Sequence, residues 1–354
     1  MGTSNNNISD IARRAGVSTT TVYKAMHNLK GVSDARRAEI LKIAQEMNYQ
    51  GNPIARTLAR KTIRIGVVFE ALNPEFTFHA LEGVKAIYEQ FKHYNVEMIF
   101  CKTGGDVDKK RVLDNFASLL EQEVNGIILF PSIPYLEYAQ FNSTIEERKL
   151  PVVTIVNDVP HLKCLVRVQY DGELLGRMAG DLMNLCNPGG SSAVIIGNKD
   201  VNAQERTIAG FKAVIEGRGG EVVAAYENQY IEDINRLVMD RLFKTSPSVN
   251  GIFVGVSQSV QVIDYLRERG LLPLLRVITV DTYPYLTQCL AAGDIIATLD
   301  RQPFQMGRIA VRAIYSYLND ARLPENRILL PGSVVLPSGV GYVQQPREPL
   351  LEIF

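Results

Sequence analysis

The stretch AGVSTTTVYKAMHN, residues 15–28, decides how the first part of this chain folds. Gly16 can end a helix because it adopts the left-handed conformation without a steric penalty, and Ser18 can cap the helix that follows. This second helix carries three consecutive threonines, which are mediocre helix formers, and it has little to bury. So much polar surface on so short a helix needs an explanation outside the helix itself.

Apolar and polar residues fall on opposite faces of this expected helix. The apolar face can pack on the helix before it and consists of Val22, Ala25 and Met26. The stripe of that preceding helix has the same spacing and consists of Ile8, Ile11, Ala12 and Ala15. A third helix opens at Ser33 and buries Ile40, Ile43, Ala44 and Met47. Two helices joined by a glycine-centred turn are typical of the helix-turn-helix, whose second helix enters the major groove of DNA.

The polar face of the second helix is therefore a candidate DNA-reading surface. Hydroxyl groups bind bases or phosphates, and lysine can reach the acceptors of guanine. The expected DNA contacts are Ser18, Thr19, Thr20, Tyr23 and Lys24. Residues 1–62 hold ten lysines and arginines against four aspartates and glutamates, a net charge of +6 in a chain that is neutral overall. A basic head suits a polyanion, and a solvated polar face on a small helical cap is the alternative.

The segment GNPIARTLARK, residues 51–61, predicts a short linker helix. Asn52 can cap it, and Pro53 occupies the first helical position, where its missing N–H costs nothing. About two turns of helix are too short to be stable alone in water. We expect this basic segment, with Asn52 and Arg56, to order only when it binds DNA.

From Ile63 onward, short apolar runs alternate with helical stretches, which predicts parallel sheets covered by helices on both faces. The region is too long for one small sheet. Two lobes, each a doubly wound α/β sheet, are the natural arrangement, with a cleft at the carboxyl ends of the strands. Residues 158–172 are expected to cross between the lobes. The expected domains are an all-α head (1–50), a linker (51–62), the two-lobed body (63–345) and a tail (346–354).

Several motifs together resemble the lactose/galactose-repressor (LacI/GalR) family of bacterial transcription regulators. They are ISDIARRAGVSTTTVYKAMHN, VSDARRAEILKIAQEMNY and NPIARTLARKTIRIGVVF, then LNPEF, ERTIAGFKAVI, VITVD and IIATLDRQPFQMGRIAV. The resemblance implies a homodimer whose two heads read a roughly palindromic operator. It implies a body with the fold of type I periplasmic sugar-binding proteins, which binds an effector and dimerises.

The resemblance also assigns a role to the linker and exposes a departure in the reading helix. It implies a hinge helix in which Leu58 enters the minor groove, as apolar wedges do; packing of Leu58 between head and body is the alternative. Tyr23 and Lys24 stand where many members have Ser-Arg. Since lysine lacks the fork of arginine, a bidentate guanine contact is not expected from it.

Two carboxylates, Asp158 and Asp281, follow expected strands at the cleft. Each can accept hydrogen bonds from neighbouring sugar hydroxyls, or can instead cap a turn. Phe76 can stack on the apolar face of a sugar or belong to the core. By resemblance, an aspartate at the position of Asp281 contacts ligand. The cleft arginine of the family falls at Thr207, and Arg206, one residue earlier, is the candidate for that ligand contact.

Arg301 follows the expected strand IIATL and faces the expected cleft. Relatives with this spacing commonly place a glutamine here, which hydrogen-bonds a neutral sugar. A guanidinium fork suits a carboxylate or phosphate instead. One hypothesis is therefore a sugar-like effector with an acidic group, held by Asp281, Asp158 and Arg301. The alternative is that Arg301 simply pairs with Asp300 or Asp281.

Catalysis, metals and cofactors are not expected. No glycine-rich phosphate loop follows the first strand, no G-x-S-x-G or H-E-x-x-H motif occurs, and the four histidines and four cysteines are dispersed. Without a long apolar run or an apolar signal-peptide core, the sequence favours the cytoplasm. We expect a ligand-responsive transcription regulator, most simply a repressor. A sugar-binding protein of this fold without transcriptional output is the alternative.

Overall fold

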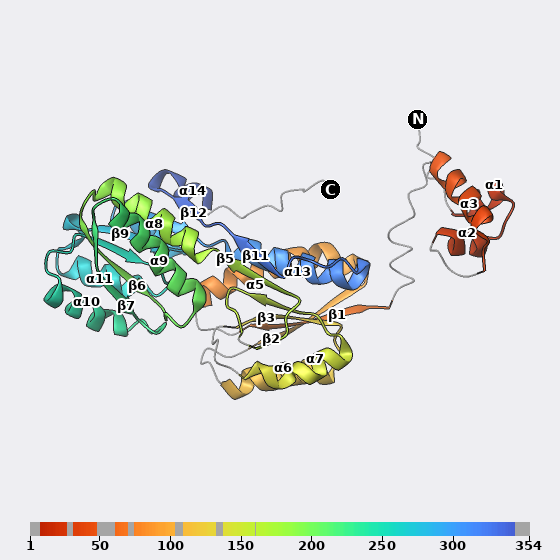
Figure 1. The fold of residues 1–354 in the computed structure, drawn as a ribbon, viewed down its shortest axis with the longest axis horizontal. Coiled ribbons are helices and arrows are strands. Elements are labelled where there is room, and N and C mark those ends of the chain that lie inside the picture. Colours follow the sequence, from red (N-terminus) through yellow and green to blue (C-terminus); the bar gives the residue numbers. More distant parts are fainter. Residues whose placement is uncertain are drawn as a thin grey trace. The chain divides into compact units, whose positions relative to one another are not determined.

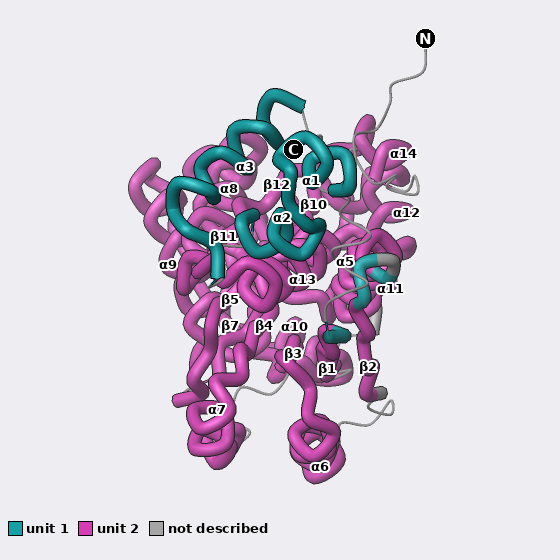
Figure 2. Tube along the Cα trace, turned by 90° about the vertical axis from the view of Figure 1, so that its right-hand side faces the viewer, with its two compact units in different colours: residues 1–62, 92–95 teal, residues 63–91, 96–354 magenta. Residues whose placement is uncertain are grey.

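The computed structural model describes residues 8–26, 31–47, 61–69, 74–102, 109–131, 137–159 and 161–343. The chain divides into two compact units, residues 1–62 with 92–95 and residues 63–91 with 96–354 (Figure 2). The first unit contains a helical head and the second contains a two-lobed α/β body. Both parts of the expected fold class are therefore present.

Three short helices build the head (Figure 1): α1 Ile8–Ala15, α2 Thr19–Met26 and α3 Asp34–Glu46. Gly16 between α1 and α2 has a φ of 63°, the left-handed conformation expected of a helix stop. Ser18 and Ser33 each accept a hydrogen bond from the backbone N–H three residues on, at 3.1 and 3.4 Å, which confirms both caps. The buried residues belong to the expected apolar stripes: Ile11, Ala12, Ala15, Val22, Ala25, Ile40 and Ala44.

Two six-stranded sheets define lobe 1 and lobe 2 of the body. The strand order is β11-β5-β4-β3-β1-β2 in lobe 1 and β12-β10-β9-β8-β6-β7 in lobe 2. Neighbouring strands pair in parallel, apart from the antiparallel pair β10–β12. The strands of lobe 1 are β1 Ile63–Phe69, β2 Val96–Lys102, β3 Gly126–Phe130, β4 Val152–Ile155, β5 Val166–Tyr170 and β11 Arg327–Leu330. Those of lobe 2 are β6 Ser191–Ile196, β7 Glu221–Glu227, β8 Gly251–Val254, β9 Arg276–Val280, β10 Ala297–Asp300 and β12 Ser333–Val335.

Helices pack on both faces of each sheet, as buried parallel strands require. Lobe 1 carries α5 Pro74–Phe91, α6 Lys109–Glu121, α7 Asn142–Arg148 and α13 Pro303–Asp320. Lobe 2 carries α8 Gly172–Cys186, α9 Asn202–Gly217, α10 Ile234–Thr245, α11 Val260–Glu268, α12 Pro284–Ala292 and α14 Val340–Val343. Short 3₁₀ turns are η1 Lys92–Tyr94, η2 Tyr138–Phe141, η3 Leu272–Leu274 and η4 Pro337–Gly339. Within the described ranges, no helix is both long and apolar enough to cross a membrane.

Within residues 161–343 the chain passes between the lobes three times: from β5 to α8, from β10 to α13 and from β11 to β12. Helix α8 follows β5 of lobe 1 but packs on β9 and β10 of lobe 2, and α13 follows β10 but packs on β3, β4 and β5. The crossover expected over residues 158–172 contains strand β5, and the chain crosses at the end of this stretch, between Tyr170 of β5 and Gly172 of α8. Strands β11 and β12 were not expected either, because they are short and largely face solvent, so they lack a continuous apolar run.

Close contact between α5 and α13 depends on two glycines. A Cβ on Gly307 would lie 2.1 Å from the carbonyl oxygen of Ala80, and one on Gly83 would lie 2.0 Å from that of Phe304. Since no other residue fits such an approach, the first turns of α13 are held against α5. Arg301, two residues before α13, is thereby fixed at the junction of the lobes.

Candidate DNA-reading face and effector cleft

Helix α2 turns a polar face outward and an apolar face inward. Thr19, Thr20 and Tyr23 are exposed, with 44% of Tyr23 accessible, whereas Val22 and Ala25 are buried in the core of the head. This division agrees with the helical spacing of the sequence. An exposed polar ridge on the second helix of such a head has the form that enters a major groove.

The remaining expected DNA contacts differ in exposure, in hydrogen bonding and in whether the structure describes them. Lys24 is partly exposed on α2. The Ser18 hydroxyl lies 2.9 Å from that of Thr21 and accepts a hydrogen bond from the Thr21 N–H, so it is already used to cap α2. A DNA contact by Ser18 stays a prediction. Asn52, Arg56 and Leu58 lie outside the described residues.

The second candidate site is a cavity at the carboxyl ends of the strands of both lobes, where sites in such sheets lie. Lobe 1 lines it with Phe76, Thr77, Phe130, Val156, Asn157 and Tyr170. Lobe 2 lines it with Gln204, Tyr230, Val256, Ser257, Gln258 and Arg301. The cavity leaves about 50 Å³ for water-sized occupants, enough for a few water molecules. This cavity is too small for a sugar, whereas a neighbouring hollow of about 680 Å³ lies between the lobes and is lined by Phe76, Asp281 and Asp300 among others.

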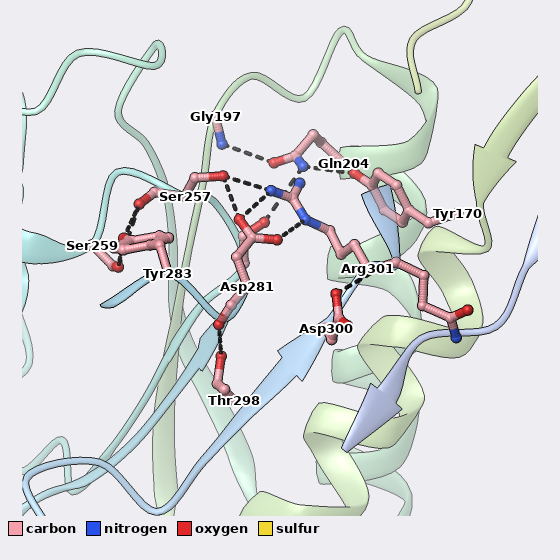
Figure 3. A network of polar contacts seen from close by, with 12 residues as sticks. Tyr170, Gly197, Gln204, Ser257, Ser259, Asp281, Tyr283, Thr298, Asp300 and Arg301 are labelled. Atoms are coloured by element: carbon pink, nitrogen blue, oxygen red, sulfur yellow. Dashed lines mark hydrogen bonds and ion pairs between the residues drawn. The ribbon is translucent and has the colours of Figure 1, made fainter. Parts of the chain in front are cut away.

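A buried ion pair of lobe 2 reaches this cavity through Arg301 (Figure 3). Arg301 donates from Nε to Asp281 Oδ1 at 2.9 Å and from Nη2 to Asp281 Oδ2 at 2.6 Å, and Nη2 also lies 2.6 Å from Ser257 Oγ. Ser257 donates to Asp281 Oδ2 at 2.5 Å. Burial alone would lower the pKa of Arg301, but the charge and hydrogen bonds of Asp281 outweigh it and raise that pKa. The guanidinium is therefore charged and already has a counter-charge.

Two aromatic rings of lobe 1 enclose this guanidinium of lobe 2. The guanidinium carbon of Arg301 lies 4.3 Å from the ring centroid of Phe76 and 5.3 Å from that of Tyr170, within the range of cation–π attraction. The Tyr170 hydroxyl accepts a hydrogen bond from Gln204 Nε2 at 2.9 Å. Phe76 in turn packs on Phe130, with ring centroids 6.2 Å apart. These contacts join the two lobes directly.

Strained backbone lies at matching positions of the two lobes. Val156 follows β4 with a φ of 72°, and Asp281 follows β9 with a φ of 73°. Both N–H groups donate at 2.8 Å to the neighbouring strand, to Val168 and Leu299 respectively. A β-branched residue in the left-handed region is an outlier, and strain of this kind clusters at ligand clamps and other functional sites. The strain supports a binding role for the cavity.

Two of the expected ligand contacts do not reach the cavity. Asp158 is half-exposed and accepts a hydrogen bond from Arg167 Nε at 2.7 Å, while Arg206 pairs with Glu173 at 2.8 Å. The physical reason for Asp158 is that β4 ends at Ile155, one residue earlier than expected, so the inward positions fall on the next two residues. Neither Asp158 nor Arg206 lines this cavity, and a ligand contact by either residue stays a prediction.

The other three expected residues lie together: Phe76 and Arg301 line the cavity, and Asp281 binds Arg301 and lines the neighbouring hollow. The arrangement is the simple pairing of Arg301 with Asp281, the alternative that the sequence had left open. Asp300 lies beside this pair, and its Oδ1 accepts a hydrogen bond from the Gln302 N–H at 2.8 Å. Because its oxygens already bind Arg301 and Ser257, the Asp281 carboxylate is engaged before any sugar arrives.

Several residues that line the cavity were not predicted from the sequence. They are Val156, Asn157, Tyr170, Gln204, Ser257 and Gln258. Most of them follow or end a strand, so the rule that clefts lie at carboxyl ends could have found them. Gln258 Oε1 is buried without a hydrogen-bond partner, which marks an acceptor that a ligand or water can satisfy.

The described ranges hold no cluster of acidic, histidine or cysteine side chains suited to a metal ion. All four cysteines are free thiols. Burial raises the pKa of Cys164 to about 12, which keeps this thiol protonated and unreactive at neutral pH.

Comparison with known proteins identifies both parts of the chain. The family model "Bacterial regulatory proteins, lacI family" matches residues 7–52, and the family model "Periplasmic binding protein domain" matches residues 65–322. The ribose operon repressor of Halalkalibacterium halodurans is 25% identical over 336 residues, which are 93% of this chain and 95% of that protein. Catabolite control protein A of Priestia megaterium is 23% identical over 334 residues, 92% of this chain and 96% of that protein.

Solved structures agree on the fold of the body. A glucose-galactose binding protein from Geobacillus stearothermophilus superposes with a TM-score of 0.69 at 21% identity, over 79% of this chain and 99% of that one. At this identity the likeness concerns the two-lobed fold alone. The reading helix, the two-lobed body and the matched models of both parts lead to one conclusion: the chain belongs to the lacI family of bacterial DNA-binding transcription regulators.

Proposed function

We propose that this regulator binds a roughly palindromic operator as a homodimer in the cytoplasm and responds to a small sugar or sugar-like effector in the cleft. Repression is the simplest output, in line with the name of the ribose operon repressor that the chain resembles along its length. The exposed polar face of α2 supports the DNA-binding part. Two-fold related heads would match two half-sites of one operator.

The observation that carries the effector part is the position of Arg301. Its guanidinium belongs to lobe 2 but lies between two aromatic rings of lobe 1, so a ligand that moves it also changes how the lobes meet. Lobe 1 begins at Ile63, directly after the linker. A change in the arrangement of the two lobes therefore acts on the linker, which connects the body to the head. A ligand can shift the protein only as far as it binds one arrangement of the lobes better than the other.

Aromatic and polar groups of the cavity suit the two faces of a sugar. The rings of Phe76, Phe130, Tyr170 and Tyr230 offer apolar surface, and amide groups such as Gln258 offer hydrogen-bonding partners. Pockets of this kind fix a small ligand with apolar walls and a few oriented polar groups. Since this cavity holds only water-sized occupants, we expect a sugar to enter it when the lobes separate.

The proposed effector is neutral rather than acidic. Arg301 already uses Nε and Nη2 on Asp281, so an acidic group would place a second buried negative charge beside this carboxylate with one guanidinium to neutralise both, which is unfavourable. A neutral ligand leaves the ion pair intact. The acidic sugar suggested by Arg301 in the sequence is therefore the weaker form of the proposal.

A binding experiment with the full chain tests both parts. An operator duplex is first selected from random sequences with the wild-type protein, and its affinity is measured across a salt series, where several phosphate contacts give a steep slope. Neutral sugars (ribose, glucose, galactose, allose) and acidic ones (glucuronate, galacturonate, ribose 5-phosphate) are then titrated into the complex. We expect a neutral sugar to change operator affinity.

The outcomes separate the alternatives. If no duplex is enriched while a sugar still binds, the chain is a sugar-binding protein without transcriptional output. If only an acidic sugar changes operator affinity, the neutral-effector proposal is wrong, but the proposal of a sugar-responsive regulator still holds. If no sugar binds at all, the effector belongs to another chemical class.

A further inference from the structure

Helices α1 and α2 end inside the head, and their last carbonyl groups have no partner within the helix. These carbonyls form the negative ends of the helix dipoles, where cations are stabilising. The first turn of α3 brings two consecutive arginines, Arg36 and Arg37, to these ends. The two arginines serve different helices.

Arg37 binds the carboxyl end of α2. Its Nη1 donates to the carbonyl oxygens of Lys24 at 3.3 Å and Ala25 at 3.2 Å, and its Nη2 donates to that of Val32 at 3.4 Å. Arg36 binds the end of α1 through Nη2 and the carbonyl oxygen of Ala15 at 3.1 Å. Both side chains are half-buried.

These contacts place Arg37 directly beneath the expected reading surface. Lys24, whose carbonyl it binds, carries one of the side chains expected to reach DNA, and Tyr23 precedes it in the same turn. Carbonyl oxygens from α2 and from the loop before α3 meet on one guanidinium fork. A lysine offers no such planar fork, so it cannot reproduce the full set of contacts.

We infer that Arg37 is a positioning residue of the DNA-reading helix. It fixes the last turn of α2 against α3 and thereby aims Tyr23 and Lys24, while its own charge is used on carbonyl groups rather than on phosphate. The inference rests on the proposed DNA-binding function. It also means that the net charge of the head overstates the number of phosphate contacts.

The test compares Arg37→Lys and Arg37→Met with wild type, using the full chain, the selected operator and a random duplex. Positioning predicts a loss of operator affinity on the order of tenfold for Arg37→Met and a smaller loss for Arg37→Lys. Random-duplex affinity and the slope of log K against log [salt] should stay unchanged, because no phosphate contact is lost.

Lys42→Met is the matched control for charge. Lys42 is an exposed residue of the same helix, so its replacement removes one positive charge without touching the end of α2. Any effect of Lys42→Met should fall equally on both duplexes. If Arg37→Met behaves in that way too, with a slope smaller by about 1, Arg37 binds phosphate and the inference is overturned.

A measurement without DNA reports directly on the last turn of α2. Amide hydrogen exchange of α2 in the absence of DNA should be faster in Arg37→Met than in Lys42→Met, and equal rates would overturn the positioning role even if no operator exists. If Arg37→Met fails to fold, Arg37→Lys provides the test: a lower ratio of operator affinity to random-duplex affinity than wild type supports positioning, and an unchanged ratio contradicts it. A wild-type chain that binds no duplex defeats the proposed function, and the exchange result still stands on its own.

Discussion

The reading face of α2 and the centre of the cleft use polar side chains in opposite ways. On α2, Thr19, Thr20 and Tyr23 are exposed on a helix whose other face is buried. In the cleft, Arg301 and Asp281 are 5% and 4% exposed and bind each other. The first surface is built to gain partners from outside. The second has satisfied its charges internally, so a ligand must add to the ion pair or break it.

The largest effect that can sharpen this comparison concerns the ion pair. Asp281→Asn leaves the buried guanidinium without its counter-charge, and we expect it to lower the free energy of unfolding of the body by about 3–5 kcal/mol. Chemical denaturation followed by circular dichroism measures it. Asp281→Asn combined with Arg301→Gln should recover much of the loss, because no buried charge is then left unpaired.

Asp158→Asn is the matched control on the other lobe. It removes a carboxylate that is half-exposed and paired with Arg167, so it should cost about 1 kcal/mol or less. Equal losses for Asp281→Asn and Asp158→Asn would contradict the claim that the cleft charges depend on each other.

The second effect concerns the reading face. Thr20→Ala and Lys24→Ala should each weaken binding to the selected operator by about 1–3 kcal/mol and change random-duplex binding far less, because base contacts carry the sequence information. Fluorescence anisotropy on both duplexes measures the difference. Arg13→Ala, at an exposed site on α1, is the control. A loss of the same size on both duplexes would show that these side chains meet only phosphate.

The third effect concerns the linker, whose Leu58 lies outside the described residues. If Leu58 wedges into the minor groove, Leu58→Ala should weaken operator binding by about 1–3 kcal/mol and reduce the operator bend, since unstacking a base step is linked to bending. Effector affinity and the fold of the body should not change. If the operator bend and affinity match those of wild type, Leu58 only packs between head and body.

The smallest effect separates a cap from a DNA contact. Ser18→Ala removes the side-chain acceptor of the Thr21 N–H and should lower the stability of the head by about 1 kcal/mol. Ser33→Ala, which removes the cap of α3, should cost a similar amount. If Ser18 only caps α2, neither variant changes the ratio of operator affinity to random-duplex affinity. A lower ratio for Ser18→Ala alone would make Ser18 a base contact as well.

The head could be predicted closely because its determinants are local. Gly16, Ser18 and Ser33 set the ends of the helices within a few residues, and the 3.6-residue spacing of Ile11, Val22 and similar residues decides which face is buried. The cleft was predicted only in part. Asp281 and Arg301 were predicted from their places after strands and Phe76 from the NPEF motif, and these three lie together. Because β4 ends one residue earlier than expected, Asp158 does not line the cavity.

By itself, the sequence determined the helix-turn-helix head, the alternation of strands and helices in the body, and the general position of a cleft at the strand ends. These follow from periodicity and capping, which act over a few residues. The pairing of Arg301 with Asp281, and its contact with the rings of Phe76 and Tyr170, depend on the tertiary structure. Those side chains come from segments far apart in the chain, and their distances depend on how two sheets and the crossover helices pack together.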